Sequence, residues 1–449
     1  MTGTVGLTSL SLRRLSTGGP GPGTVRSPVR RPGYRRTMSS RAEVVVVGAG
    51  LAGLSVATRL SAAGCDVQLL EAGGHVGGRL STERIDGFVV DRGFQVLNTG
   101  YPRAADLDLA ALDLGWFWPG AVVRVDGRRA RLVDPRRRPT AALDTLRAPI
   151  GSPVRKAAIA AYSVRAGYTP VERLLRERET TAEERLRQAG VGDTALERFF
   201  RPFLAGVLLE DRLETSSHYL DLLWRSFARG AIGLPARGMQ SVGEQLAARV
   251  GADRVHLGVR ATAVRGDAVD TDSGRTRADA VVVATDPDTA AELVPGLTAS
   301  TLRQVTTHLH VLPASPTGEP LLVLGTPGGR LVNSAVLTDA QPAYSPDGRA
   351  LVASSSLAPT READVRAEVA ALHGIGPGDL EHLTSVTVPQ AQPAAVPPLR
   401  LRQPVDLGGG LFVAGDHRDT PSIQGAMASG ARAARAVLRA LGTDQRGAA

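Results

Sequence analysis

Residues 43–74, EVVVVGAGLAGLSVATRLSAAGCDVQLLEAGG, decide the fold of this chain. Four consecutive valines precede glycines spaced as G-x-G-x-x-G, and a stretch of small residues and a second apolar run, ending at Glu71, follow them. This order is typical of a buried strand, a tight turn, a helix and a second parallel strand. We therefore expect a βαβ unit that binds a dinucleotide.

Each residue of this fingerprint has its own predicted role. Gly48 permits the tight turn, Gly50 lets the backbone approach a pyrophosphate, and Gly53 lets the helix pack closely on the strand. Glu71 ends the second strand, where its carboxylate can accept hydrogen bonds from ribose hydroxyls. An acidic residue at this point favours FAD or NAD over NADP.

The next stretch distinguishes between these two dinucleotides. Gly77 and Gly78 form a second glycine pair directly before Arg79. The pair lets the backbone pass close to a ligand, and Arg79 can neutralise the same pyrophosphate with two hydrogen bonds. An enzyme that binds only NAD has no use for this extension, so we expect FAD.

These motifs resemble those of the superfamily of flavin-containing amine oxidases, protoporphyrinogen oxidases and phytoene desaturases. Its members usually have Arg-x-Gly-Gly-Arg at this point, where this chain has His75 and Arg79. Two further stretches are similar to the superfamily. They are residues 408–441, GGGLFVAGDHRDTPSIQGAMASGARAARAVLRAL, and residues 234–290, which begin LPARGM and end ATDPDTA.

The resemblance implies how these stretches hold the flavin. Asp416, after Gly415, would bind ribitol hydroxyls, and Val259 and Ala284 would lie beside the dinucleotide. A helix from about Ser422 would aim backbone N–H groups at the flavin, where its positive end favours the anionic reduced form. The full set of expected contacts to non-covalently bound FAD is Gly48, Gly50, Leu51, Ala52, Gly53, Glu71, Ala72, Gly77, Gly78, Arg79, Val259, Ala284, Gly415, Asp416, Gln424, Gly425 and Ala426.

The predicted fold class is α/β. A Rossmann-like FAD-binding domain of the glutathione reductase type is interleaved with an α+β substrate domain made of an antiparallel sheet and helices. The chain is expected to alternate between the two domains after a tail (1–41). The FAD-binding domain takes residues 42–100, 231–290 and 406–442, and the substrate domain takes a helical segment (101–230) and a segment with the sheet (291–405).

The substrate side favours an apolar ligand. Leu, Phe and Trp are frequent in the helical segment, which suits an apolar tunnel. Amine oxidases of the superfamily generally hold a lysine over the flavin, whereas the only lysine here, Lys156, lies in the helical segment. We therefore expect hydride transfer to the flavin from an apolar or cyclic substrate, resembling a carotenoid precursor or a porphyrinogen. A flavin amine oxidase and a non-catalytic FAD-binding module remain as alternatives.

Several further residues could have a functional role, but the sequence does not assign one. Trp116, Phe117 and Trp118 could line a tunnel, but core packing is favoured. His417 could act as an acid or base, or be a loop histidine that contacts solvent. We assign no catalytic residue, and no metal site is expected because histidines such as His308 lack further ligands at suitable spacing.

The composition excludes other classes of protein. The chain has 449 residues, of which 43% are hydrophobic and 22% charged, as in an ordinary globular protein. Its single cysteine, Cys65, excludes an internal disulfide and favours a reducing, cytoplasmic location. Only one dinucleotide fingerprint occurs, so we expect dioxygen, a quinone or another protein to reoxidise the flavin, unless a nicotinamide binds without that motif. No run is long enough for a membrane span, although contact with a membrane surface is left open.

The net charge of +9 comes mainly from the N-terminal tail. Residues 1–37 contain seven arginines and no acid, and the rest of the chain is nearly neutral. We expect disorder there, and interpret the tail as a transit peptide, an arm for nucleic acid or anionic lipid, or a stretch before the true start at Met38. The last interpretation is favoured, and no nucleic-acid partner is expected.

Overall fold

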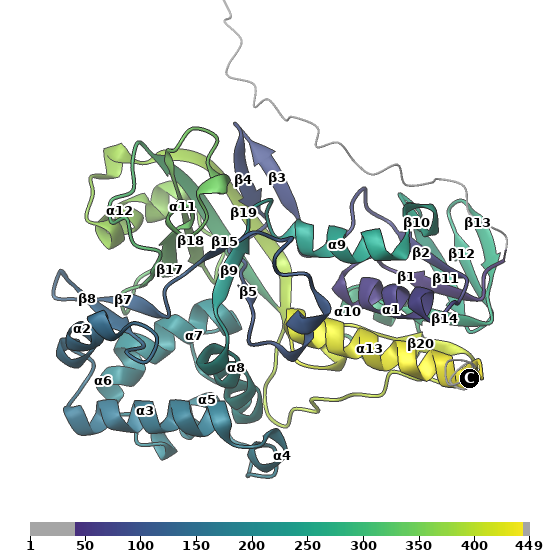
Figure 1. The fold of residues 1–449 in the computed structure, drawn as a ribbon, viewed down its shortest axis with the longest axis horizontal. Helices are drawn as coiled ribbons and strands as arrows, with labels where there is room; N and C mark the ends of the chain where they lie inside the picture. Colours follow the sequence, from purple (N-terminus) through teal and green to yellow (C-terminus); the bar gives the residue numbers. More distant parts are fainter. Residues whose placement is uncertain (1–40, 443–449) are drawn as a thin grey trace, which may run out of the picture.

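A parallel sheet forms one end of the molecule in the computed structural model, which describes residues 41–442 (Figure 1). The expectations for the N-terminal tail therefore lie outside the described residues. The strand order is β10-β2-β1-β14-β20. The strands are β1 (Val44–Val47), β2 (Val67–Glu71), β10 (Val255–Leu257), β14 (Ala280–Val283) and β20 (Leu411–Val413). They come from three distant stretches of the chain, so the sheet forms only when these stretches meet.

Helices cover one face of this sheet and a second sheet covers the other. The valines of β1 alternate, so that Val44 and Val46 contact the helices whereas Val45 and Val47 contact the second sheet. The covering helices are α1 (Leu51–Ala62), α9 (Gln240–Val250) and α13 (Ile423–Ala440). The second sheet contains β11 (Ala261–Arg265), β12 (Ala268–Thr271) and β13 (Gly274–Arg277).

A seven-stranded sheet belongs to the substrate side, with the order β19-β15-β18-β17-β16-β7-β8. The strands are β7 (Gly120–Val125), β8 (Arg128–Val133), β15 (Leu302–Leu312), β16 (Leu322–Leu324), β17 (Leu331–Val336), β18 (Ala350–Ser356) and β19 (Glu381–Pro393). Its pairings are antiparallel, as expected, except that β16 and β7 run parallel.

Two strands of this sheet come from the segment that was expected to be mostly helical. The hairpin β7–β8 turns at Asp126 and Gly127, which both have positive φ angles, of 50° and 74°. An Asp-Gly pair between alternating apolar residues is a strong hairpin signal, and it was missed in the sequence. The difference matters for function because β7 and β8 contribute residues to the cavity described below.

The helices at lower left in Figure 1 make up the rest of the substrate side. They are α2 (Ala142–Arg147), α3 (Pro153–Tyr168), α4 (Val171–Leu174), α5 (Ala182–Gln188), α6 (Asp193–Ala195), α7 (Arg201–Leu208) and α8 (Ser217–Arg229). Helix α5 begins with a capping box, in which Thr181 and Glu184 each accept the backbone N–H of the other. Helices α11 (Leu337–Ala340) and α12 (Glu362–His373) lie at upper left.

Short strands connect the two ends: β3 (Thr82–Ile85) with β4 (Phe88–Asp91), and β5 (Leu97–Asn98) with β9 (Ile232–Pro235) and β6 (Leu114–Trp116). Helix α10 (Pro287–Leu293) follows β14. Within residues 41–442, no helix is both long and apolar enough to span a bilayer.

Candidate functional site

One large cavity connects the parallel sheet with the helices of the substrate side. Its volume is about 1410 Å³, which exceeds the roughly 300–1,000 Å³ of a pocket for a single small ligand. Four of its lining residues lie at the carboxyl ends of parallel strands: Gly48 after β1, Glu71 at the end of β2, Ala284 after β14 and Asp416 after β20. Ligands of open α/β sheets bind at this edge.

The glycine turn leaves open space on the side that faces the cavity. Gly48 has a φ of 100°, and a Cβ there would lie 2.7 Å from the Ala284 carbonyl oxygen. A Cβ on Gly53 would lie 1.9 Å from the Gly48 carbonyl oxygen, so helix and turn pack too closely for any side chain. A Cβ on Gly50, in contrast, would find its nearest neighbour, the Cα of Gly78, at 4.0 Å. A pyrophosphate can approach the backbone in this gap.

The carboxylate of Glu71 holds the glycine turn by hydrogen bonds. One carboxylate oxygen accepts the Ala49 N–H at 2.8 Å, and the other accepts the Gly73 N–H at 2.7 Å. The N–H of Val259 donates to the backbone carbonyl of Glu71 at 2.9 Å, which brings these two predicted contacts together. Glu71 and Val259 both line the cavity, where remaining carboxylate lone pairs can accept ribose hydroxyls.

Arg79 and Asp416, which are far apart in the sequence, pair directly across the cavity. The two guanidinium nitrogens donate to the two carboxylate oxygens at 2.8 and 2.7 Å, and one also donates to the Ala391 carbonyl oxygen at 2.9 Å. Burial lowers the pKa of Arg79, but the Asp416 carboxylate outweighs it and the net pKa is raised. The sequence predicted separate partners for these side chains, a pyrophosphate and a ribitol, and did not predict their pairing.

The start of α13 differs in detail from the expectation. Ser422 caps the helix by accepting the Gly425 N–H, and the Ala426 N–H donates to the Ser422 carbonyl oxygen. Gln424 accepts the backbone N–H of Arg103 with its side chain. The N–H groups of Gly425 and Ala426, both expected contacts of the flavin, are thus engaged within the chain. Ser422 and Ile423 line the cavity, whereas Gln424 and Gly425 do not.

Most of the other predicted contacts lie in the cavity wall. The lining includes Gly48, Gly50, Leu51, Ala52, Glu71, Ala72, Gly77, Gly78, Arg79, Val259, Ala284, Gly415, Asp416 and Ala426. Gly53, Gln424 and Gly425 are the three predicted residues outside it. For Gly53 and Gly425 the reason is close backbone packing, since a Cβ on Gly425 would lie 1.8 Å from the Thr420 carbonyl oxygen.

Two tyrosines beside the start of α13 were missed in the sequence. Tyr219, on α8, donates its hydroxyl to the Pro421 carbonyl oxygen at 2.9 Å. Burial raises the pKa of the Tyr219 phenol, and the nearby Tyr101 raises it further. Burial also raises the pKa of Tyr101, to about 12. Both line the cavity, so neutral aromatic hydroxyls stand between the flavin end and the helical end. No local sequence pattern marks either residue.

The helical end of the cavity is aromatic. Phe199 and Phe203 stack with their ring centroids 5.6 Å apart, and Trp224 and Phe227 meet Phe203 edge-on at 6.0 and 5.4 Å. All four line the cavity. Such edge and stacked contacts add to the free energy gained by burying the rings, so this wall is stiff as well as apolar.

The aromatic stretch after β6 also reaches the cavity. Phe117 and Trp118 pack against buried clusters, as expected, and also line the cavity, whereas Trp116 is 46% exposed. His417, beside Asp416, is buried and lies outside the lining. Both of its ring nitrogens lack a hydrogen-bond partner, and burial lowers its pKa to about 4. His417 is therefore neither a solvent-facing loop residue nor a contact of the cavity.

The residues present fit FAD. An open backbone gap at Gly50, a carboxylate at Glu71 and a helix start at Ser422 suit the pyrophosphate, the ribose and the flavin of this cofactor. Cys65 is buried beyond α1 and does not line the cavity, in keeping with a non-covalent cofactor.

Known proteins share both sequence and fold with this chain. The sequence pattern of the family described as flavin containing amine oxidoreductase matches residues 51–438. Over 54 residues the chain is 50% identical to a 4,4'-diapolycopene oxygenase of Methylomonas sp, a match that covers 12% of this chain and 11% of that protein. Across the first curated relatives, the matches span only 7 to 13% of the relative's length.

Solved structures match over nearly their whole length. A structure from Exiguobacterium sp. 255-15, ascribed to a protoporphyrinogen oxidase, has a TM-score of 0.66 at 18% identity, covering 89% of this chain and 99% of that one. The cyclohexylamine oxidase of Brevibacterium oxydans IH-35A gives the same values. These similarities confirm the predicted fold class, and the family match extends the agreement to a flavin cofactor. The chain belongs to the flavin containing amine oxidoreductase family.

Proposed function

We propose that this protein is an FAD-dependent oxidoreductase that dehydrogenates an apolar or cyclic substrate, of the kind represented by carotenoid precursors and porphyrinogens. The observation that carries the proposal is the continuity of the cavity, which joins the predicted FAD contacts to the aromatic wall of Phe199, Phe203, Trp224 and Phe227. Similar proteins support both substrate types, since they include a diapolycopene oxygenase and a structure ascribed to a protoporphyrinogen oxidase.

The charges of the cavity wall support an uncharged substrate. Four carboxylates line it, and each already has a partner within the chain: Glu71 holds backbone N–H groups, Asp134 pairs with Arg136, Asp286 caps α10 and Asp416 pairs with Arg79. Asp134 and Asp416 are therefore neutralised by arginines, and Glu71 is held at the predicted dinucleotide end, so neither arginine pair nor Glu71 offers a free counter-charge for a cationic amine beside the aromatic wall. An apolar substrate has no such requirement.

The single lysine is also remote from the flavin end. Lys156, on α3, donates its ammonium to the Leu146 carbonyl oxygen at the α2–α3 corner. Figure 1 places α2 and α3 at the opposite end of the molecule from α1 and α13. Lys156 therefore lines the outer part of the cavity and has no place beside a flavin at the sheet.

The side chains contribute binding, orientation and exclusion of water. Bound FAD would accept a hydride from a substrate C–H bond. The aromatic wall positions the substrate and excludes water, while the N-terminus of α13 presents positive potential to an anionic flavin. Tyr101 and Tyr219 stay neutral at ordinary pH because burial raises the pKa of both phenols, so they can orient a substrate without adding charge.

Anaerobic titration of the FAD-loaded full-length protein tests the proposal. We expect the flavin absorbance to bleach with a polyene precursor or with protoporphyrinogen, and to recover with dioxygen, a quinone or another protein as acceptor. Putrescine and cyclohexylamine serve as matched amines. Bleaching by the amines alone contradicts the proposal, and a flavin that stays oxidised with every compound identifies a non-catalytic FAD-binding module.

Amine oxidation is the second candidate, and one observation favours it. Tyr101 and Tyr219 frame the cavity next to Pro421, where aromatic rings can enclose an amine substrate. The amine arm of the same titration decides between the two candidates.

A further inference from the structure

Helices α2 and α3 expose an unusual amount of apolar surface. Eight large hydrophobic side chains are strongly exposed within residues 41–442, and five of them lie on these two helices. They are Leu143, Leu146, Val154, Val164 and Tyr168, with exposed fractions of 53, 66, 77, 50 and 64%. On α3, Val154, Ala157, Ala161, Val164 and Tyr168 follow the three-and-four spacing of a single helix face. Contiguous exposed apolar surface of this kind marks an interaction site.

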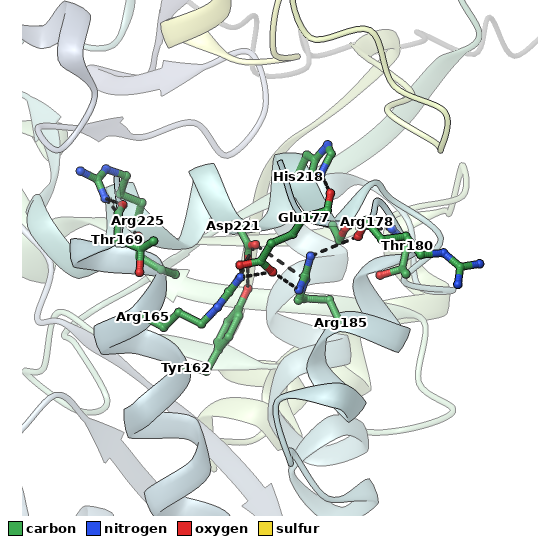
Figure 2. Close-up of polar contacts among 12 residues, drawn as sticks. Tyr162, Arg165, Thr169, Glu177, Arg178, Thr180, Arg185, His218, Asp221 and Arg225 are labelled. Atoms are coloured by element: carbon green, nitrogen blue, oxygen red, sulfur yellow. Dashed lines mark hydrogen bonds and ion pairs between the residues drawn. The ribbon is translucent and has the colours of Figure 1, made fainter. Parts of the chain in front are cut away.

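The inward face of α3 combines apolar packing by Tyr162 and Ala166 with polar contacts that anchor the helix. Figure 2 shows Tyr162 and Arg165 pointing inward, toward Asp221 and Glu177. Tyr162 donates to the fully buried Asp221 at 2.9 Å, and Arg165 pairs with Glu177 at 2.5 Å. Arg225, on α8, donates to three carbonyl oxygens at the C-terminal end of α3. These contacts hold α3 with its apolar face outward.

The cavity opens at this surface. Leu146 and Val164 are at least half exposed and also line the cavity, as does Lys156. The mouth of the substrate side is therefore surrounded by exposed apolar residues.

The charges around the mouth are mainly basic, because its two nearby carboxylates, Asp134 and Asp144, each pair with an arginine. No acidic residue occurs between Asp144 and Glu172, a stretch that contains Arg147, Arg155 and Lys156. Beside it, Arg136, Arg137 and Arg229 line a smaller pocket of about 260 Å³ together with Tyr168. Apolar residues flanked by arginine and lysine complement the interface of an anionic bilayer.

We propose that the α2–α3 face docks on anionic lipid membranes and opens the cavity to the acyl region, from which an apolar substrate enters. The entry of substrate rests on the function proposed above, whereas the docking does not. A second copy of the chain is a poorer occupant because its own arginines would face those of the first. The Arg-rich N-terminal stretch is disfavoured for the same reason.

Vesicle sedimentation of the oxidised, FAD-loaded full chain tests the docking without any turnover. The vesicles contain phosphatidylcholine alone or phosphatidylcholine with phosphatidylglycerol. Because the tail could bind anionic vesicles by itself, all proteins carry serine in place of its seven arginines, Arg13, Arg14, Arg26, Arg30, Arg31, Arg35 and Arg36. The test variant is Leu146→Glu with Val164→Glu. The matched control is Leu407→Glu with Val396→Glu, which changes two exposed hydrophobic residues elsewhere.

We expect binding to the anionic vesicles only, with the partition coefficient about tenfold lower in the test variant and unchanged in the control. The absence of binding, or equal binding of the test variant and the control, overturns the proposal. A dimer in light scattering that dissociates in the test variant also overturns it, since a second copy then covers the face. A protein that docks but oxidises no substrate retains this inference and loses the proposed function.

Discussion

The two ends of the cavity are built by different means. At the sheet end, the wall is mainly backbone. It consists of the turn at Gly48, the open space beside Gly50 and the backbone N–H groups that donate to Glu71. At the helical end, the wall is side chain, with Phe203, Trp224 and their neighbours packed ring against ring. Backbone geometry suits a cofactor of constant shape, whereas a side-chain wall can change with the substrate. Substitutions at the two ends should therefore affect different ligands.

The largest effect is expected from filling the backbone gap. In Gly50→Leu, a side chain occupies the space in which a pyrophosphate approaches, so FAD affinity should fall about a thousandfold, or about 4 kcal/mol. The melting temperature of the apoprotein should change little, because the added Cβ meets nothing closer than 4.0 Å and the rest of the side chain can extend into the cavity that Gly50 lines. Fluorescence titration with FAD measures the affinity. Gly378→Leu is the matched control, since a Cβ on Gly378 also meets nothing within 4 Å. Equal affinities of the two variants would break the comparison.

The next effect concerns the ion pair at the sheet end. Asp416→Asn leaves the Arg79 guanidinium without its counter-charge, and the free energy of unfolding should fall by about 3 kcal/mol. Urea denaturation of this variant, of Arg79→Gln and of the double variant gives the coupling between the two residues. A double variant that loses the full sum of the single losses would mean that the pair is not coupled.

His417 should make the protein sensitive to acid. Its pKa is about 4 in the folded chain, where burial disfavours the charged ring, against an ordinary value of 6.5. Stability is therefore highest above pH 6.5, where the ring is neutral in both states, and falls as pH drops toward 4, because only the unfolded chain takes up the proton. Between pH 7 and pH 5, this ring should cost about 2 kcal/mol. Denaturation at both pH values measures the free energy of unfolding. His417→Phe should lose about 2 kcal/mol less than the unmodified protein between pH 7 and pH 5. Equal losses in the two proteins would assign the acid sensitivity to other groups.

The smallest effect is expected at the helical end. Phe203→Ala removes a ring from the cavity wall, so kcat/KM for an apolar substrate should fall about tenfold, or about 1.4 kcal/mol. Steady-state kinetics and FAD titration of the same preparation measure both ends at once. The comparison predicts unchanged FAD affinity. A parallel loss of FAD affinity would show that the two ends are not independent.

The sheet end could be predicted from the sequence because its conformation is encoded locally. Gly48, Gly53 and Glu71 act within one βαβ unit, and their spacing fixes their geometry. Neither the hydrogen bond from Tyr219 to Pro421 nor the pairing of Arg79 with Asp416 could be foreseen, because both depend on how distant segments pack.

Other differences have equally physical causes. The hairpin β7–β8 was obscured by the helical segments that follow it, although its Asp126-Gly127 turn is a local signal. At α13, the side chain of Ser422 accepts a hydrogen bond from the N–H of Gly425. This contact depends on the residue at which the helix begins. The domain boundaries near residues 100, 230, 290 and 405 remain a prediction.

The central claim is that the sheet end holds FAD without a covalent bond. The absorption spectrum of the full-length protein, recorded after incubation with FAD and gel filtration, tests it most directly. We expect a flavin spectrum with one FAD per chain, and release of all the flavin when the protein is denatured. A colourless protein, or flavin that stays attached to the denatured chain, would contradict it.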